Sequence, residues 1–204
     1  MQRKLLLPIP AKPILSTFLT RLETLYAQID QAYQSAAARC GFACSGCDEN
    51  CCLTRFHHHT LLEFFHLREG FRQLPLPEQR SAKRRAETVL TVYEAAQKTE
   101  APPRTMCPLN VEQRCRLYGY RPMICRMHGL PHVLHPTGRP PIYGPGCASF
   151  SESCANPTAA VFDRTPFYRN MAALEKEMRS AAGFTGKTKM TVAEMILCFC
   201  EHEP

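Results

Sequence analysis

The sequence predicts a mainly α-helical protein, a single domain over residues 1–204 with about five helices and a long irregular cysteine-rich segment that binds metal. Two observations support this prediction. Apolar residues recur at spacings of three and four along several stretches, as on the buried face of an amphipathic helix. Ten of the 12 cysteines stand between residues 40 and 154, where proline and glycine interrupt any helical period. With 45% hydrophobic residues, the chain can bury one core.

A long amphipathic helix is expected after a flexible, proline-rich lead-in over residues 1–13. Its apolar face alternates spacings of three and four residues, and it comprises Leu15, Phe18, Leu22, Leu25 and Ile29. Pro13 suits the first turn, and Cys40 with Gly41 ends the helix. The helix therefore delivers the chain into a loop dense in cysteine.

A second helix is predicted to begin at Thr60, because Thr60 and Glu63 have the spacing of a capping box. Pro75 and Pro77 are expected to end it. A third helix follows, and its apolar face comprises Ala82, Ala86, Val89, Tyr93 and Ala96.

The densest basic cluster lies on the other side of this third helix, at Arg80, Lys83, Arg84 and Arg85. The net charge is +7, a moderate excess that favours a solvated helix face over a phosphate-binding surface. Tryptophan is absent and aromatic residues make up only 9%, so no platform for stacking bases is apparent. Nucleic acid is therefore not an expected partner.

Two helices are predicted at the C-terminal end. The first spans 165–183, because a threonine followed by proline starts it and a glycine ends it. The second spans about 191–199 and begins at a capping box formed by Thr191 and Glu194. Between Cys107 and Cys154 we expect only a short helix at 122–126, with any strands confined to 133–143.

The cysteines are the candidate chemical groups of the chain. A dense block is followed by isolated positions, and the ten residues are Cys40, Cys44, Cys47, Cys51, Cys52, Cys107, Cys115, Cys125, Cys147 and Cys154. Thiolates two and three residues apart let one loop present several soft ligands to one centre. Buried free thiols are the disfavoured alternative for the block. Cys40 and Cys154 lie at the margins of the block and are interpreted as spare.

Disulfides are the competing explanation, and they need an oxidising compartment. The apolar run Leu5–Leu7 is too short for a signal peptide, and no stretch reaches the roughly 20 apolar residues that span a bilayer. We therefore expect a cytoplasmic protein without a membrane partner, whose cysteines bind metal. The two cysteines of the last helix, Cys198 and Cys200, are interpreted as core or helix-end thiols.

Three motifs follow one another: Cys44-x2-Cys47-x3-Cys51-Cys52, then Cys107-Pro108-Leu109, then Cys115-x-Leu-Tyr-x2-Arg-Pro-x2-Cys125-Arg. In this order they resemble the bacterial YkgJ-like, or CxxCxxCC, family, described as zinc- or iron-chelating. The resemblance covers roughly residues 40 to 150. Three residues, 48–50, separate Cys47 from the paired cysteines, where the family pattern has two.

The resemblance implies metal binding and leaves a reaction open. Flagellin lysine methylases resemble the same family in their cysteine pattern, which implies that such a cluster can accompany methyl transfer. The chain has neither a G-x-G-x-x-G loop nor a P-loop, so this activity is not carried over. A nucleophilic cysteine is also disfavoured, because metal-bound thiolates are poorly available.

The expected ligands are Cys44, Cys47, Cys51, Cys52, Cys107, Cys115, Cys125 and Cys147. Zinc frameworks usually repeat the C-x2-C pair, and the chain has no second pair, which favours an iron–sulfur cluster over zinc. Eight thiolates exceed the four that one centre needs, so the sequence allows either two centres or ligands of one centre with supporting thiols.

Histidines form a second candidate site. Glu63 and His66 are three residues apart, and His59 could join them, as in carboxylate-bridged metal sites. Because Glu63 already serves the capping box and no second Glu-x-x-His exists, a structural role is favoured. At most one of His128, His132 and His135 is expected to replace a cysteine ligand.

The predicted function is a metal-binding protein with a redox, sensing or cluster-dependent role. A structural zinc adaptor and a methyl-transfer enzyme are the alternatives. Arg121 and Arg126 either tune the potential of the cluster or serve as ordinary surface or helix-end arginines. The expected partner is an unidentified protein or redox partner, and the sequence carries no signal of oligomeric state or substrate.

Overall fold

The computed structural model describes residues 10–44, 51–96, 103–154 and 156–201. Over these ranges the chain is mainly α-helical, as predicted, with seven α-helices and two small sheets. Six of the helices correspond to predicted ones. The additional helix is α5 (Ala148–Ser153), which has only six residues.

The two longest elements on one side of the molecule are α1 (Lys12–Ala38) and α6 (Thr165–Ala181), which pack along each other. The predicted apolar stripe of α1 is buried at Phe18, Leu22, Leu25 and Ile29. An ion pair of 2.6 Å joins Arg21 to Glu177 across the two helices. Both side chains are about half exposed, so this pair contributes little to stability compared with the apolar contact.

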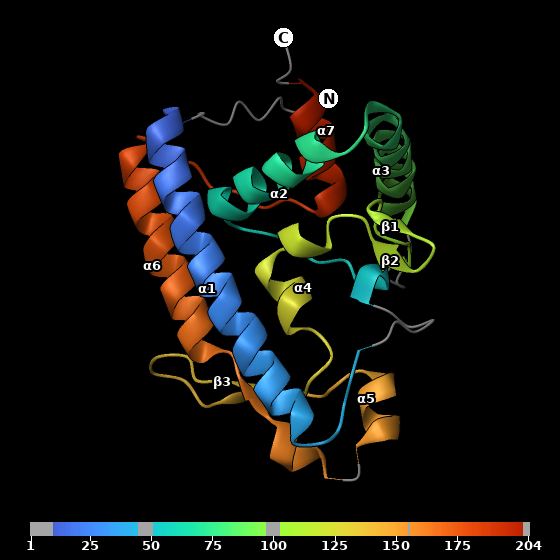
Figure 1. Cartoon of the computed structure of the whole chain (residues 1–204), viewed down its shortest axis with the longest axis vertical. Coiled ribbons are helices and arrows are strands. Elements are labelled where there is room, and N and C mark those ends of the chain that lie inside the picture. Colours follow the sequence, from blue (N-terminus) through green and yellow to red (C-terminus); the bar gives the residue numbers. More distant parts are fainter. Residues whose placement is uncertain (1–9, 45–50, 97–102, 155, 202–204) are drawn as a thin grey trace.

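The buried helix α2 (Leu61–Gln73) lies between α1 and the pair formed by α3 (Leu76–Ala96) and α7 (Val192–Glu201) (Figure 1). Nearly every side chain of its first three turns is buried, as expected for a helix that packs on several sides. The predicted end of this helix is confirmed at Pro75. Pro77, in contrast, lies in the first turn of α3 and does not end α2.

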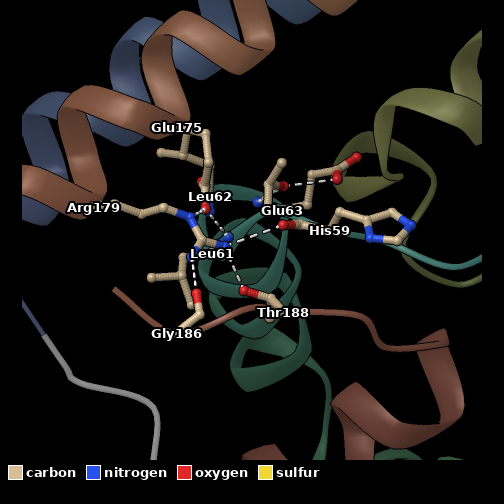
Figure 2. Close-up of polar contacts among 9 residues, drawn as sticks. His59, Leu61, Leu62, Glu63, Glu175, Arg179, Gly186 and Thr188 are labelled. Atoms are coloured by element: carbon tan, nitrogen blue, oxygen red, sulfur yellow. Dashed lines mark hydrogen bonds and ion pairs between the residues drawn. The ribbon is translucent and has the colours of Figure 1, made fainter. Parts of the chain in front are cut away.

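A hydroxyl and a carboxylate anchor the start of α2. Thr60 accepts a hydrogen bond from the backbone of Glu63, as predicted. Glu175 of α6 accepts hydrogen bonds from the N–H groups of Leu61 and Leu62 at 2.8 and 3.1 Å. Figure 2 shows Arg179 beside this carboxylate, donating to it and to acceptors in the chain that leads to α7. An anion at a helix N-terminus satisfies its free donors.

The predicted capping box of α7 is confirmed. Thr191 accepts from the N–H of Glu194, and the Glu194 carboxylate accepts from the N–H of Thr191 at 2.6 Å. The start of α6 differs by one residue from the prediction, because Arg164 is its N-cap and Thr165 accepts from the N–H of His135 instead.

The segment from 103 to 163 contains more structure than predicted. A hairpin joins β1 (Asn110–Val111) to β2 (Arg114–Cys115). A second sheet pairs β3 (His132–Leu134) antiparallel with β4 (Ile142–Gly144) and parallel with β5 (Phe162–Asp163). The prediction that strands are confined to 133–143 is therefore wrong, since β1, β2 and β5 lie outside that range.

Short helical turns complete the fold. They are η1 (Cys51–Leu53), η2 (Tyr118–Tyr120), α4 (Met123–Met127) and η3 (Pro157–Ala160). The predicted short helix at 122–126 is confirmed as α4. Within the four described ranges, no helix combines the length and the apolar character needed to cross a bilayer.

Candidate metal centre

The candidate centre lies where η1, the β1–β2 hairpin and α4 meet. The N–H of Cys107 donates to the carbonyl of Cys52 at 2.8 Å, so these two residues are held side by side although they are 55 positions apart in the sequence. This backbone contact joins the paired cysteines to the second motif.

The hairpin brings Cys115 back toward Cys107. Asn110 pairs with Cys115 across the strands, and the N–H of Asn110 donates to the carbonyl of Cys107 at 2.9 Å. The two turn residues, Glu112 and Gln113, have φ of 52° and 62°, a left-handed conformation that glycine or asparagine usually occupies. The turn that places Cys115 opposite Asn110 therefore holds two residues in an unfavourable backbone conformation.

A buried carboxylate positions the third cysteine segment. Glu63 accepts a hydrogen bond from the N–H of Met123 at 2.8 Å, and its other oxygen accepts from the Thr60 hydroxyl. Met123 is the first residue of α4, which carries Cys125. Burial raises the pKa of Glu63, and its two hydrogen bonds oppose that shift. The residue is therefore part of the scaffold that fixes α4.

The thiols of these segments interact directly. Hydrogen bonds from Cys107, Cys51 and Asn110 lower the pKa of Cys52 to about 3. The pKa of Cys107 is raised well above its usual range, because its proton is donated to Cys52 and its surroundings are buried. Of these two thiols, Cys52 is therefore the one that loses its proton more readily.

Cys115 and Cys125 border the same group. Burial is the main cause that raises the pKa of each thiol. The charge of Cys52 raises both pKa values further. Cys125 further interacts with Cys115. The structure therefore brings together Cys52, Cys107, Cys115 and Cys125, which we name the four-thiol group.

The two candidate arginines have different roles. Arg121 stacks on the ring of Tyr118 at 3.5 Å, and its charge lowers the pKa of Cys52, Cys115 and Cys125 as a secondary cause. Arg126 is buried, pairs with Asp30 at 2.6 Å and lies over the ring of Tyr26. Arg121 therefore faces the thiols, whereas Arg126 fixes α4 on α1.

Two other predicted ligands lie near Tyr33, whose hydroxyl donates to the carbonyl of His128 at 2.9 Å. Burial raises the pKa of Tyr33, and the Cys44, Cys147 and Cys51 thiols raise it further. Cys44 is exposed and Cys147 is partly buried. Both thiols therefore lie on the side of Tyr33.

The remaining cysteines divide as follows. Cys47 lies outside the described residues, as does the side chain of Cys200. Cys198 is partly buried on α7, as predicted. Cys40 and Cys154 are joined in a disulfide with a Cα–Cα distance of 5.3 Å. The interpretation of these two as spare thiols, and the exclusion of disulfides, are therefore wrong for this pair.

The histidine site is not assembled. His66 packs edge-on against Tyr26. The Glu63 carboxylate already accepts hydrogen bonds from the Thr60 hydroxyl and the N–H of Met123. His59 is exposed on the loop before α2. Of the three histidines predicted as possible replacement ligands, His128 is the one whose pKa responds to Cys52. Burial lowers the pKa of His128, and the charge of Cys52 opposes that shift. The preferred structural role of Glu63 fits these contacts.

The four-thiol group is a donor set, but it is not in coordination geometry. Within the described residues, no three side chains of His, Cys, Asp or Glu stand in an arrangement that holds a metal ion. Cys107 and Cys51 instead donate hydrogen bonds to Cys52. A cation that displaced those protons would satisfy all four thiolates at once, so the donor chemistry fits a thiophilic metal.

Two residues that the sequence analysis did not single out support the group. Asn110 donates to Cys52. Arg85 of α3, which belongs to the basic cluster, donates to the carbonyl of Pro108 at 2.7 Å. Pro108 directly follows Cys107, a contact that the sequence does not predict. No sequence signal marks either contact, because both partners are distant along the chain.

A hollow of about 390 Å³ is lined by Glu23, Tyr26, Asp30, His66, Tyr120 and Arg126 among others. None of the candidate cysteines lines it. The Asp30–Arg126 ion pair crosses its wall, so these two charged groups already have partners.

Comparison of the chain with protein-family models, with curated proteins and with solved structures gives no match. The resemblance to the YkgJ-like family therefore stays a prediction that rests on the order and spacing of the cysteine motifs. The functional argument depends on the contacts of the thiols themselves.

Proposed function

We propose that the chain is a metal-binding protein that holds an iron–sulfur cluster through the four-thiol group, Cys52, Cys107, Cys115 and Cys125. The observation that carries this proposal is the backbone contact that holds Cys107 beside Cys52, together with the hairpin that returns Cys115 toward Cys107. Cys125 of α4 joins them, since both Cys115 and Cys52 raise its pKa. Four cysteine thiolates are the usual ligand set of such clusters.

The bound cluster would supply one-electron transfer, which suits a redox or sensing role. Hydrogen bonds to the ligand sulfurs and nearby charge set the potential of such a centre. Asn110 and Arg121 are the groups placed to act in this way, the first as a donor to Cys52 and the second as a nearby positive charge. A partner protein that exchanges electrons with the cluster is part of the same proposal.

Zinc is the second candidate, and one contact favours it. Cys52 and Cys107 are close enough for their thiols to share a proton. Two ligands of one tetrahedral zinc ion, each at about 2.3 Å from the metal, lie about 3.8 Å apart, which is a similar spacing. A structural zinc module would serve as an adaptor and would lose its fold on chelation.

We propose a cytoplasmic location on the chemistry of the ligands. Ligand cysteines remain reduced most readily in the cytoplasm, where we place the protein. The Cys40–Cys154 disulfide is the feature that fits an oxidising compartment instead.

Metal and acid-labile sulfide analysis of protein purified without oxygen and without a histidine tag tests the proposal. We expect iron with matching sulfide and a brown chromophore, lost in Cys115→Ser and kept in the control Cys198→Ser. Stoichiometric zinc without sulfide would select the zinc module. Protein that retains no metal would rule out both.

A further inference from the structure

The hollow of about 390 Å³ lies where four elements meet, and the proposed metal centre has no use for it. Half of its lining residues come from α1, and the others come from α2, η2 and α4. Figure 1 shows α2 and α4 on the same side of α1, and α1 contacts both. The volume is within the range of about 300–1,000 Å³ that small-molecule sites occupy.

One face of α1 supplies two carboxylates to the hollow. Glu23, Tyr26, Ala27 and Asp30 line it, and their spacing of three, four and seven residues places them on the same side of the helix. Ala27 is exposed and has only a methyl group. The helix therefore leaves room between the carboxylates of Glu23 and Asp30.

Three aromatic rings form another part of the wall. The His66 ring of α2 packs against Tyr26 and against Tyr120 of η2, with centroid distances of 5.2 and 5.0 Å. Burial, and then the charge of Arg126, lower the pKa of His66 to about 4, so this ring is neutral at pH 7. Neutral aromatic rings attract a cation that lies within about 6 Å of their centroids.

The guanidinium in the wall is already used by the protein. Arg126 donates to Asp30 at 2.6 Å, to the carbonyl of Arg121 at 2.9 Å and to the carbonyl of Gly119. Its plane also lies over the Tyr26 ring, 4.1 Å from the centroid. Arg126 therefore neutralises Asp30 and has little capacity left to bind an anionic ligand.

Glu23 is the carboxylate of the wall that no cation balances within the described residues. Its side chain is 61% exposed, and its contact with a basic group is His66 Nε2, 3.9 Å from Oε1. That distance is too long for a hydrogen bond, and the imidazole carries no charge at pH 7. The hollow therefore combines one unbalanced negative charge with aromatic surface.

We propose that the hollow binds the ammonium group of a small organic amine, with the Glu23 carboxylate as its counter-ion. An ammonium group donates the hydrogen bonds that a carboxylate accepts, and its alkyl part can pack against the rings of His66 and Tyr120. The committed hydrogen bonds of Arg126 decide the sign of the ligand charge. No step of this proposal depends on metal at the four-thiol group.

Titration of the wild-type protein with n-butylammonium chloride tests the proposal. n-Butanol and sodium butyrate serve as probes of the same chain length that lack the positive charge. We expect the ring-proton NMR signals of His66 and Tyr120 to shift saturably with n-butylammonium, and much less with the other two probes. An equally strong response to butanol or butyrate, or no response to n-butylammonium, would overturn the site.

Three variants locate the binding. Glu23→Gln keeps the size of the side chain and removes its charge, so the dissociation constant should rise about 10-fold. Ala27→Phe keeps every charge but fills the space, so the saturable shift should disappear. Glu87→Gln removes an exposed carboxylate from α3, outside the hollow, and should bind as wild type does. Wild-type affinity in Glu23→Gln or Ala27→Phe, or an equal loss in Glu87→Gln, would overturn the proposal.

Discussion

Individual residues of the scaffold link the core to the candidate centre. Glu63 lies in the first turn of the buried helix α2, yet its carboxylate reaches across to α4 and accepts from Met123. The Glu63 side chain therefore bonds both to the N-cap of α2 and to the first residue of α4, the helix that carries Cys125. The sequence predicts the contact of Glu63 with Thr60 in the capping box. It does not predict the contact with Met123, which is 60 residues away.

Replacement of Glu63 tests this positioning role. Glu63→Ala leaves the buried N–H of Met123 without its acceptor, which should lower the free energy of unfolding by about 1–3 kcal/mol. Because α4 then loses one of its two anchors and keeps only the Arg126–Asp30 pair, metal affinity should fall by about 10-fold or more. Glu63→Gln keeps an acceptor oxygen and should restore most of the affinity. Competition with a chelator measures this, and equal affinity in wild type and Glu63→Ala would contradict the role.

His66 predicts a pH dependence of stability. Burial, and then the charge of Arg126, lower its pKa from 6.5 to about 4. The unfolded chain therefore binds a proton that the folded chain does not, so stability is full above pH 6.5 and falls as the pH drops toward 4. A shift of this size corresponds to about 3 kcal/mol.

The check is urea unfolding between pH 4 and 7. His66→Phe keeps a ring beside Tyr26 and should remove this part of the slope, whereas the exposed His59→Gln should leave it. His58, whose pKa is also lowered to about 4 by burial, adds a loss of the same sign that remains in both variants. An unchanged slope in His66→Phe would contradict the assignment.

At the scale of elements, the sequence predicts the helices well and the strands poorly. The helices have both a 3.6-residue apolar period and end signals, such as the capping box of Thr191 and Glu194. The β1–β2 hairpin has neither, because Glu112 and Gln113 stand where glycine or asparagine would signal the turn. The strand β5 depends on pairing with distant β3, which no local pattern shows.

The hairpin turn offers a prediction about strain. Gln113 has φ of 62°, which costs a residue with a Cβ about 1–2 kcal/mol. Gln113→Gly removes that cost but increases the entropy of the unfolded chain, so the net gain in unfolding free energy should be about 0.5–1 kcal/mol. Gln113→Val should lower stability, because a β-branched residue fits this conformation least. Urea unfolding of the two variants decides, and a lower stability for Gln113→Gly than for wild type would contradict the strained turn.

The disulfide connects the end of α1 to the end of α5, with a sequence separation of 114 residues. Closing so long a loop restricts the unfolded chain, so Cys40→Ser should lower the free energy of unfolding by about 2–4 kcal/mol without reductant. Cys154→Ser should have the same effect, and the double variant should add nothing. Cys198→Ser serves as the control, and wild-type stability in Cys40→Ser would show that the bond does not form in solution.

At the scale of the whole molecule, the helices form a frame and the irregular segments between them carry the thiols. The buried helix α2 fixes α4 through Glu63, and α3 fixes the Cys107 loop through Arg85. The hydroxyl of Tyr33 on α1 donates to the carbonyl of His128, directly after α4. Cysteine spacing predicts that these segments share a chemical role. It does not predict which thiols meet, because that depends on contacts between segments that are far apart in the sequence.

The most direct test of the four-thiol group is X-ray absorption at the edge of whichever metal the wild-type protein retains. We expect a first shell of sulfur only, at about 2.3 Å, with a further iron–iron shell if the centre is a cluster. Replacement of Cys115 by serine should reduce the bound metal, and with it the edge signal. A shell dominated by nitrogen or oxygen, or a protein that retains no metal, would contradict the account.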